Sequence, residues 1–220
     1  MGSPDDQQLA FVTSAIDTLL ADHPPATTDT YEFRGHRYDA GLAWVHFAEG
    51  FGGLGVRPDL NRLVEDRCRR AGARVTEPST FFMALAAPTI VTHGTDDQKR
   101  RLLRPMFTGA ERWCQLFSEP GAGSDFAGLA TRAVRDGEEW VVNGQKVWNT
   151  LAHVADWGML VARTDPEAPK HKGMTYFALN MRLPGVEVRP LRQITGEAEF
   201  NEVYMTDVRV PDDCRIGAVG

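Results

Sequence analysis

The chain has 220 residues, of which 42% are hydrophobic and 25% charged, and its formal net charge is −6. This composition is typical of a folded globular protein and excludes a collagen-like or low-complexity chain. The acidic balance argues against a general nucleic-acid binder, because phosphate backbones attract basic surfaces. The sequence contains no apolar run of the roughly 18–20 residues that a membrane span needs, and its start does not resemble a signal peptide.

Three cysteines, Cys68, Cys114 and Cys214, stand far apart in the sequence. An odd number without close spacing indicates free thiols in a reducing compartment, so the predicted location is the cytoplasm. The six histidines stand singly, without an HxxxH or CxxC pair. No metal site is therefore predicted.

The first half of the chain is predicted to be helical. Apolar residues recur at helical spacing from Leu9 to Leu20, and a proline pair ends this helix within residues 23–28. The stretch 41–56 is apolar but interrupted by glycines, which favours a buried loop. The next helix is predicted over residues 58–73.

Two further helices are predicted in this half. Residues 81–94 are apolar nearly all round, which is typical of a central buried helix. Residues 95–98 read TDDQ, a capping box in which the Thr95 hydroxyl accepts from the Gln98 N–H and the Gln98 side chain reaches back. The box opens a short helix that ends near Gly109.

The second half, from about residue 111, is predicted to be rich in strands. Residues 131–148 alternate in polarity around Asp136-Gly137 and Asn143-Gly144, two dipeptides that favour hairpin turns. Further strands are predicted at residues 112–118, 157–164, 174–180, 185–191 and 200–211. Helices followed by strands predict a multi-domain α+β fold, with an all-α domain at residues 1–110 and an antiparallel β-barrel or sandwich domain at residues 111–220.

The stretch SEPGAGSD, residues 118–125, is the first candidate site. Gly121 and Gly123 permit conformations closed to other residues and let a ligand approach the backbone. The N–H groups of Gly123, Ser124 and Asp125 can then bind an anion. A tight turn capped by Ser124 or Asp125 is the alternative. A dinucleotide-binding Rossmann fingerprint is excluded, because its third glycine is missing and no βαβ unit surrounds the stretch.

The stretch GQKVWNT, residues 144–150, is the second candidate. Trp148 stands at the end of a predicted strand, beside Asn149 and Thr150. An indole face next to small hydrogen-bonding groups suits a flat ring system such as a flavin or a purine. A tryptophan of the hydrophobic core is the alternative.

Together these segments resemble the acyl-CoA dehydrogenase family. The family's first signature resembles residues 115–125, and its second resembles NGQKVWNTLAHVADW at residues 143–157. PGVEVRPL, VRVPDDCRIG and, in the helical half, THGTDDQKRRLLRPMFTGAERW also match. The matches keep the family's order and cover nearly the whole chain.

The resemblance implies that FAD lies extended across the β-domain. The positions that align with the family's cofactor contacts are Gln115, Phe117, Ser118, Gly123, Ser124, Trp148, Asn149 and Thr150. Ser124 also aligns with a contact to the acyl-CoA ligand. Ser118 stands where many relatives have Thr, and Asn149 where many have Ile or Thr, so the site stays small and polar.

The implied activity is the FAD-dependent α,β-dehydrogenation of an acyl-CoA thioester to the trans-2-enoyl-CoA, with electrons passed to an electron-transfer flavoprotein. The resemblance also implies a homo- or hetero-oligomer. The alternatives are an acyl-CoA oxidase or a flavin monooxygenase on the same scaffold, or a non-catalytic subunit that completes a site with a partner chain.

No catalytic residue is assigned. In the family the catalytic glutamate belongs to a C-terminal helical bundle that these residues do not include, so this chain alone is expected to be inactive. Glu119 lies in the cofactor loop, where its role is expected to be structural. Glu197, Glu199 and Glu202 are expected to be exposed.

Overall fold

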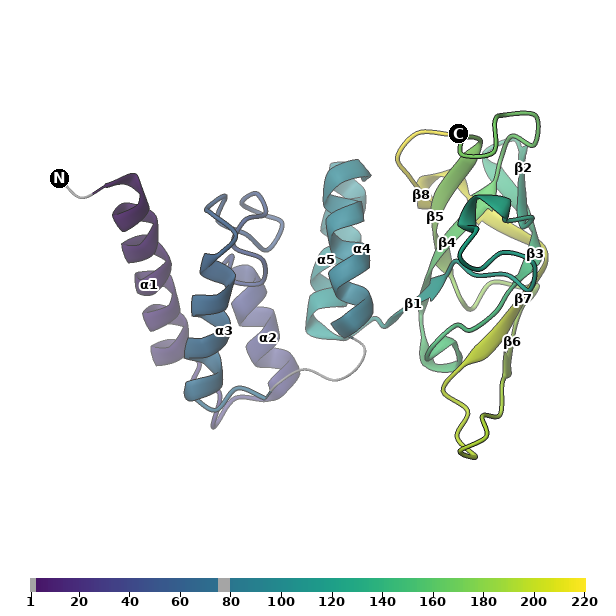
Figure 1. Cartoon of the computed structure of the whole chain (residues 1–220). Helices are drawn as coiled ribbons and strands as arrows, with labels where there is room; N and C mark the ends of the chain where they lie inside the picture. Colours follow the sequence, from purple (N-terminus) through teal and green to yellow (C-terminus); the bar gives the residue numbers. More distant parts are fainter. Residues whose placement is uncertain (1–2, 75–79) are drawn as a thin grey trace. The chain divides into compact units, whose positions relative to one another are not determined.

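The computed structural model describes residues 3–74 and 80–220 (Figure 1). Two compact units divide the chain, one formed by residues 1–80 and 99–110, the other by residues 81–98 and 111–220. Helices make up the first unit and strands dominate the second, which confirms the predicted α+β class. The predicted domain boundary at residues 110 and 111 stays a prediction, and in this division residues 81–98 group with the strands.

Five α-helices are described: α1 (Pro4–Asp22), α2 (Thr30–Asp39), α3 (Leu60–Arg70), α4 (Thr80–His93) and α5 (Asp96–Thr108). The apolar residues of the first predicted helix form one face of α1, where Val12, Ile16 and Leu19 are buried. α2 was not predicted, because its sequence TYEFRGHRYD is polar at most positions and has a central glycine. Asp29 starts this helix by accepting the N–H groups of Tyr31 and Glu32.

The predicted capping box before α5 is confirmed. The Thr95 N–H donates to Gln98 Oε1 at 2.8 Å, and the Gln98 N–H donates to Thr95 Oγ1 at 3.2 Å. The prediction that α4 is buried all round is wrong. Its Ile90 is buried, whereas Leu85 on another face is 41% exposed.

Among the described residues, eight strands form one sheet: β1 (Trp113–Leu116), β2 (Arg132–Asp136), β3 (Glu139–Lys146), β4 (Trp157–Arg163), β5 (Met174–Asn180), β6 (Val186–Pro190), β7 (Asn201–Pro211) and β8 (Arg215–Ile216). Their order is β6-β7-β3-β2-β4-β5-β8, with β1 paired to β4. Most pairs are antiparallel, as predicted, but β1 and β2 each pair with β4 in parallel. The chain crosses over between β1 and β4, so no hairpin forces them to run in opposite directions.

The two turn dipeptides behave differently. The predicted hairpin forms between β2 and β3, where Asp136 pairs with Glu139 and Gly137 begins the turn. The turn predicted at Asn143-Gly144 is wrong, because β3 continues through it with a bulge against β7. A Cβ on Gly144 would lie 2.4 Å from Thr131 Oγ1, so close packing against Thr131 explains this glycine.

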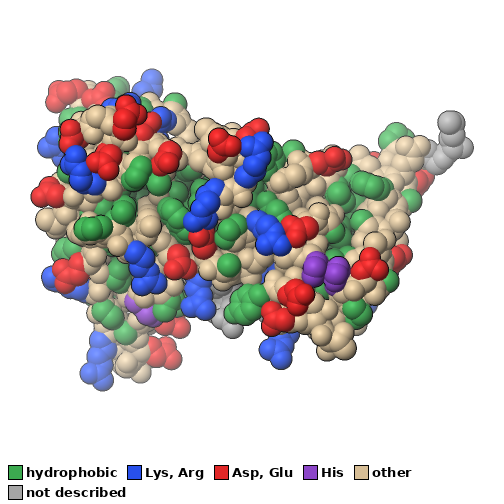
Figure 2. Space-filling view, turned by 180° about the vertical axis from the view of Figure 1, so that it is seen from behind, with side chains coloured by type: hydrophobic (Ala, Val, Ile, Leu, Met, Phe, Trp, Pro, Cys, Tyr) green, Lys and Arg blue, Asp and Glu red, His purple; other side chains and the backbone are tan. Residues whose placement is uncertain are grey.

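Each unit has an apolar core. In the helical unit α1 packs with α3 around Leu42 and Val45 of the connecting loop. In the second unit Trp140, Phe177 and their neighbours fill the core. Among the described helices, none combines the length and apolar character that a membrane crossing requires. On the face shown in Figure 2, acidic and basic side chains are interspersed.

Candidate functional site

Hydrogen bonds join the two candidate segments at the ends of β1 and β3. The Gln115 carbonyl accepts from Asn149 Nδ2 at 2.7 Å, and the Ser118 carbonyl accepts from the Val147 N–H at 2.8 Å. The segments are about thirty residues apart in the sequence, yet they lie side by side. The predicted contact residues Gln115, Phe117, Ser118, Trp148 and Asn149 are therefore brought together.

Trp148 is displayed at the surface. Its side chain leaves the residue 64% exposed, and the ring meets that of Phe200 edge-on at 6.3 Å. The alternative of a core tryptophan is therefore wrong. Its backbone is left-handed, with φ of 61°, and Leu151 is also left-handed at 58°. Non-glycine residues adopt this conformation at a cost, and such strain is often found at functional sites.

Asn149 is only 2% exposed and holds this segment from its buried side. Its N–H donates to the Asn201 carbonyl and the Asn201 N–H donates back, both at 3.0 Å. Asn201 Nδ2 adds a third bond to the Asn149 carbonyl at 2.9 Å. Because Asn149 Nδ2 is committed to Gln115, its side chain supports the sheet rather than displaying a polar group at the surface.

The loop after β1 is a tight turn that also leaves donors free. The Glu119 N–H donates to the Ala122 carbonyl at 2.9 Å, and the Ala122 N–H donates back at 3.1 Å. Beyond this turn, Gly123, Ser124 and Asp125 are exposed, and within the described chain their N–H groups donate no hydrogen bond. The tight turn is therefore present, but it is closed by Glu119 and Ala122 rather than capped by Ser124 or Asp125. Anion binding by the N–H groups of Gly123, Ser124 and Asp125 stays a prediction.

The conformational role predicted for Gly121 and Gly123 is wrong. Neither Gly121 nor Gly123 has a positive φ, so neither adopts a conformation closed to other residues. A Cβ added at either position would meet open space. The fold does not require these glycines, and what they provide is unobstructed access to the backbone.

Three hydroxyls of the predicted site are unpaired in the part of the chain that the structure describes: those of Ser118, Ser124 and Thr150. Ser118 and Thr150 are half-buried, whereas Ser124 is exposed. Among the described residues, no hydrogen bond joins Gly123, Ser124 or Thr150 to Trp148. The structure therefore places the predicted site residues in two groups. One lies at the end of β1 and around Trp148, and the other lies on the loop after β1.

Glu119 anchors the loop beneath the surface. Its carboxylate accepts the Ala130 N–H at 2.7 Å, the Thr131 N–H at 3.0 Å and Lys146 Nζ at 2.8 Å. Burial disfavours the charged form, but these hydrogen bonds outweigh it and lower the pKa of Glu119. The carboxylate is fully engaged, which agrees with its expected structural role.

A basic loop beside the first segment was missed by the sequence reasoning. Lys170 Nζ donates to Asp125 Oδ2 at 2.5 Å, and Arg163 Nη2 donates to the Ala127 carbonyl at 2.6 Å. Lys170, His171 and Lys172 are consecutive and exposed. The triplet was the available signal, but nothing in the sequence showed that it lies beside Asp125.

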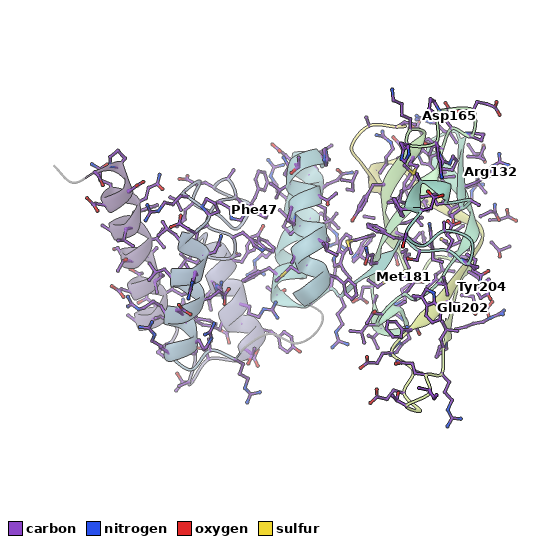
Figure 3. All side chains as sticks on the ribbon, in the orientation of Figure 1. Phe47, Arg132, Asp165, Met181, Glu202 and Tyr204 are labelled. Atoms are coloured by element: carbon purple, nitrogen blue, oxygen red, sulfur yellow. The ribbon has the colours of Figure 1, made fainter. Side chains whose placement is uncertain are left out.

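Of the other glutamates, Glu197 and Glu199 are exposed, as expected. The expectation for Glu202 is wrong, because it is half-buried. Its carboxylate accepts from Gln145 Nε2 at 3.2 Å and from the Tyr204 hydroxyl at 3.1 Å, and Tyr204 lies near it on β7 (Figure 3).

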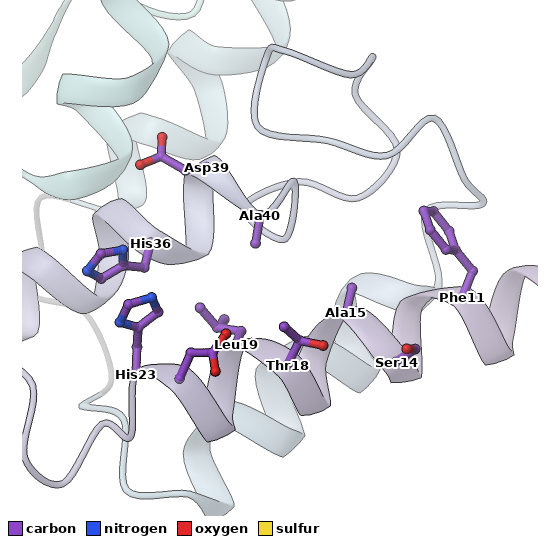
Figure 4. A pocket seen from close by; sticks show the side chains of 10 residues that line it. Phe11, Ser14, Ala15, Thr18, Leu19, His23, His36, Asp39 and Ala40 are labelled. Atoms are coloured by element: carbon purple, nitrogen blue, oxygen red, sulfur yellow. The ribbon is translucent and has the colours of Figure 1, made fainter.

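A separate hollow of 420 Å³ lies between α1 and α2 (Figure 4). The rings of His23 and His36 stack there, with centroids 3.5 Å apart and planes 4° from parallel. Stacked imidazoles present faces rather than nitrogen lone pairs to each other, which does not suit a shared metal. Over residues 3–74 and 80–220, no group of three His, Cys, Asp or Glu residues is arranged to hold a metal ion.

Comparison with known families decides what the two segments belong to. The model of the acyl-CoA dehydrogenase N-terminal domain matches residues 10–110, and that of the acyl-CoA dehydrogenase middle domain matches residues 114–208. The chain belongs to the acyl-CoA dehydrogenase family. The resemblance inferred from the signatures is confirmed.

Curated acyl-CoA dehydrogenases are similar over most of this chain. Acyl-CoA dehydrogenase FadE34 of Mycobacterium tuberculosis is 49% identical over 181 residues, which are 82% of this chain and 25% of FadE34. Acyl-CoA dehydrogenase IpdE1 of the same organism is 42% identical over 181 residues, which are 82% of this chain and 47% of IpdE1. The chain thus spans a quarter to a half of these relatives.

Solved structures of the family share the fold. The ChsE4-ChsE5 complex from Mycobacterium tuberculosis matches with a TM-score of 0.68 at 32% identity, over 100% of this chain and 57% of that chain. The Tcur3481-Tcur3483 steroid ACAD matches with a TM-score of 0.69 at 28% identity, over 99% of this chain and 58% of that chain.

Proposed function

We propose that this chain provides the flavin-binding part of an acyl-CoA dehydrogenase. The proposed reaction is the α,β-dehydrogenation of an acyl-CoA thioester to the trans-2-enoyl-CoA, with an electron-transfer flavoprotein as the electron acceptor. The carrying observation is that the two family signatures meet at the ends of β1 and β3 and display Trp148 with a strained backbone.

The residues present suit FAD. Bound FAD supplies the hydride acceptor of the reaction. Trp148 offers an exposed aromatic face for a flat ring. Ser118, whose carbonyl accepts from the Val147 N–H, and Thr150, two residues after Trp148, offer half-buried hydroxyls. The unpaired N–H groups of Gly123 and Ser124 suit a pyrophosphate, because consecutive backbone N–H groups bind anions. Asn149 acts from the buried side of the segment, by fixing the backbone next to Trp148.

The loop also suits the substrate side of the site. Ser124 is exposed and precedes Asp125, which is tied to Lys170. Lys170, His171 and Lys172 place basic groups next to this loop, and such groups favour the phosphates of coenzyme A. Because the similar Tcur3481-Tcur3483 structure is described as a steroid ACAD, we propose steroid-type acyl-CoA thioesters as the first to test.

We propose that these 220 residues bind an acyl-CoA without oxidising it. The carboxylates of the two segments are engaged, Glu119 with Lys146 and Asp125 with Lys170. Neither is free to remove the substrate α-proton. The base is then supplied by residues outside these two segments, for example from a partner chain in a homo- or hetero-oligomer. We place the protein in the cytoplasm because its three cysteines are free.

The test is a titration of the purified chain with FAD, followed by visible absorption and flavin fluorescence. We expect a bound-flavin spectrum in the natural chain and about tenfold weaker binding in Trp148→Ala, since one lost aromatic stack is worth roughly 1–1.5 kcal/mol. Phe11→Ala, which removes an exposed aromatic from α1, is the control and should bind FAD normally.

Absence of a flavin band with excess FAD would contradict the proposed cofactor role of this chain. If FAD binds, steroid-type and fatty acyl-CoA thioesters are then added with an artificial electron acceptor. Rapid turnover would show that the base lies within these 220 residues.

A further inference from the structure

A buried ion pair lies directly behind the two signature segments. Lys146 Nζ and Glu119 Oε1 are 2.8 Å apart, and the exposed fractions of their side chains are 0% and 7%. Burying two charges costs more than most pairs regain, and removing one partner leaves an uncompensated charge. A pair this deep therefore needs further hydrogen bonds to persist.

Those hydrogen bonds all lead to segments that border the proposed site. Lys146 Nζ also donates to the Phe117 carbonyl at 3.1 Å. The Glu119 carboxylate accepts the N–H groups of Ala130 and Thr131, just before β2. The pair thus ties the end of β1, the loop, the approach to β2 and the end of β3 to one point.

The positions of the two residues in the chain explain why this matters. Glu119 is the first residue of the tight turn that presents the free N–H groups of Gly123 and Ser124. Lys146 ends β3, two residues before Trp148. The Val147 N–H, between them, donates to the Ser118 carbonyl at 2.8 Å. Any shift between Glu119 and Lys146 therefore moves the loop relative to Trp148.

We propose that Glu119 and Lys146 are positioning residues of the flavin site, which set the spacing between the pyrophosphate-facing loop and the indole of Trp148. This inference rests on the proposed FAD function. Neither side chain reaches the surface, so both act through the backbone they hold. Burial lowers the pKa of Lys146 and Glu119 opposes that shift, so each charge depends on the other.

The experiment compares Lys146→Met and Glu119→Gln with Asp212→Asn in the 220-residue chain. Asp212 makes a partly buried ion pair with Arg215, at 2.9 Å, and also accepts from Trp140 Nε1. It therefore tests whether loss of any ion pair in this unit weakens FAD binding. Each variant is measured well below its melting temperature for FAD affinity and for the visible circular dichroism of the bound flavin.

We expect at least tenfold weaker FAD binding and altered flavin dichroism in Lys146→Met and Glu119→Gln, and natural values in Asp212→Asn. If Lys146→Met does not fold, Glu119→Asp, which keeps the charge on a shorter side chain, decides the question by the same readouts. Lower melting temperatures with natural affinity and dichroism overturn the positioning role alone. Absence of FAD binding by the natural chain overturns the proposed function and, with it, this inference.

Discussion

Two glycine-rich loops of this chain are built on opposite principles. The loop of residues 41–56 is closed by its own backbone: the Gly52 carbonyl accepts the N–H groups of Ala43 and Trp44 at 3.1 and 3.0 Å. Two of its glycines, Gly52 and Gly53, are required sterically. A Cβ on Gly52 would lie 2.6 Å from the Tyr38 ring, and one on Gly53 would lie 2.1 Å from the Phe47 carbonyl oxygen.

The loop of residues 118–125 is instead held by side chains from below. Glu119 and Lys146 anchor its base, while Gly121 and Gly123 have ordinary backbone angles and open space around them. Identical residue types thus carry different information in the two loops. A glycine that the fold requires reports packing, whereas a glycine that the fold does not require indicates that something else approaches the backbone.

The largest effect is expected from a substitution in the loop of residues 41–56. Gly53→Ala should destabilise the chain by roughly 3 kcal/mol, because its Cβ would overlap backbone atoms that cannot move aside. The free energy of unfolding in urea, followed by far-ultraviolet circular dichroism, measures this. Gly121→Ala is the matched control and should leave stability nearly unchanged. An unaltered unfolding midpoint for Gly53→Ala would show that the loop is not packed as described.

The second largest effect is expected from acid, which should weaken the anchor of the second loop before it affects the first loop. The pKa of Glu119 is lowered in the folded chain, so its stabilising contribution is present above the unfolded value near 4.3 and is lost as pH falls through the folded value. Loss of its charged hydrogen bonds should cost about 2 kcal/mol locally. We expect the Ala130 and Thr131 amides to lose hydrogen-exchange protection below about pH 4, before the loop of residues 41–56 does.

Glu119→Gln is the control for this acid effect. It removes the titrating group, so protection of the same two amides should become independent of pH over that range. Simultaneous loss of protection at the Ala130 and Thr131 amides and in the loop of residues 41–56 of the natural chain would instead indicate global unfolding, and it would remove the contrast between the two loops.

Regular periodicity and local chemistry made much of the fold predictable. The capping box at Thr95 and the hairpin at Asp136-Gly137 depend on neighbouring residues, and both were identified from the sequence. The bulge at Gly144 was mistaken for a turn, because this glycine packs closely against Thr131, a residue 13 positions earlier that lies just before β2. Polar α2 gave no periodic signal.

The two segments of the candidate site could be predicted from the sequence, but the contacts that support them could not. Trp148 and Asn149 are neighbours in the sequence and were assigned to the same site. In the structure, Trp148 is exposed and Asn149 is buried. The contacts that produce this difference come from Gln115 and Asn201, which are 34 and 52 residues away from Asn149. Such long-range hydrogen bonds leave no local pattern in a single sequence.

A smaller effect is expected for Asn149→Thr. The substitution removes the Nδ2 donor and leaves the Gln115 carbonyl without this partner, which should cost about 1 kcal/mol. Because the bonds of Asn149 hold the residue next to the strained backbone of Trp148, indole fluorescence should also change. Asn143→Ala, which removes two exposed hydrogen bonds to Asp207, is the control and should leave indole fluorescence unchanged. Equal behaviour of the two variants would contradict the support assigned to Asn149.

The smallest stability effect is expected for Gly123→Ala, and it addresses the second loop directly. The new Cβ meets open space at an ordinary backbone angle, so stability should stay unchanged or rise by up to about 1 kcal/mol. If FAD approaches this backbone, the same methyl group should weaken FAD binding several-fold, measured by flavin fluorescence titration. Gly121→Ala, equally open but within the Glu119–Ala122 turn rather than in the stretch from Gly123 to Asp125, should bind FAD more nearly as the natural chain does. Natural FAD affinity in Gly123→Ala would mean that the ligand passes elsewhere, and the second loop would then lack the contrast with Gly53 that its open glycines suggest.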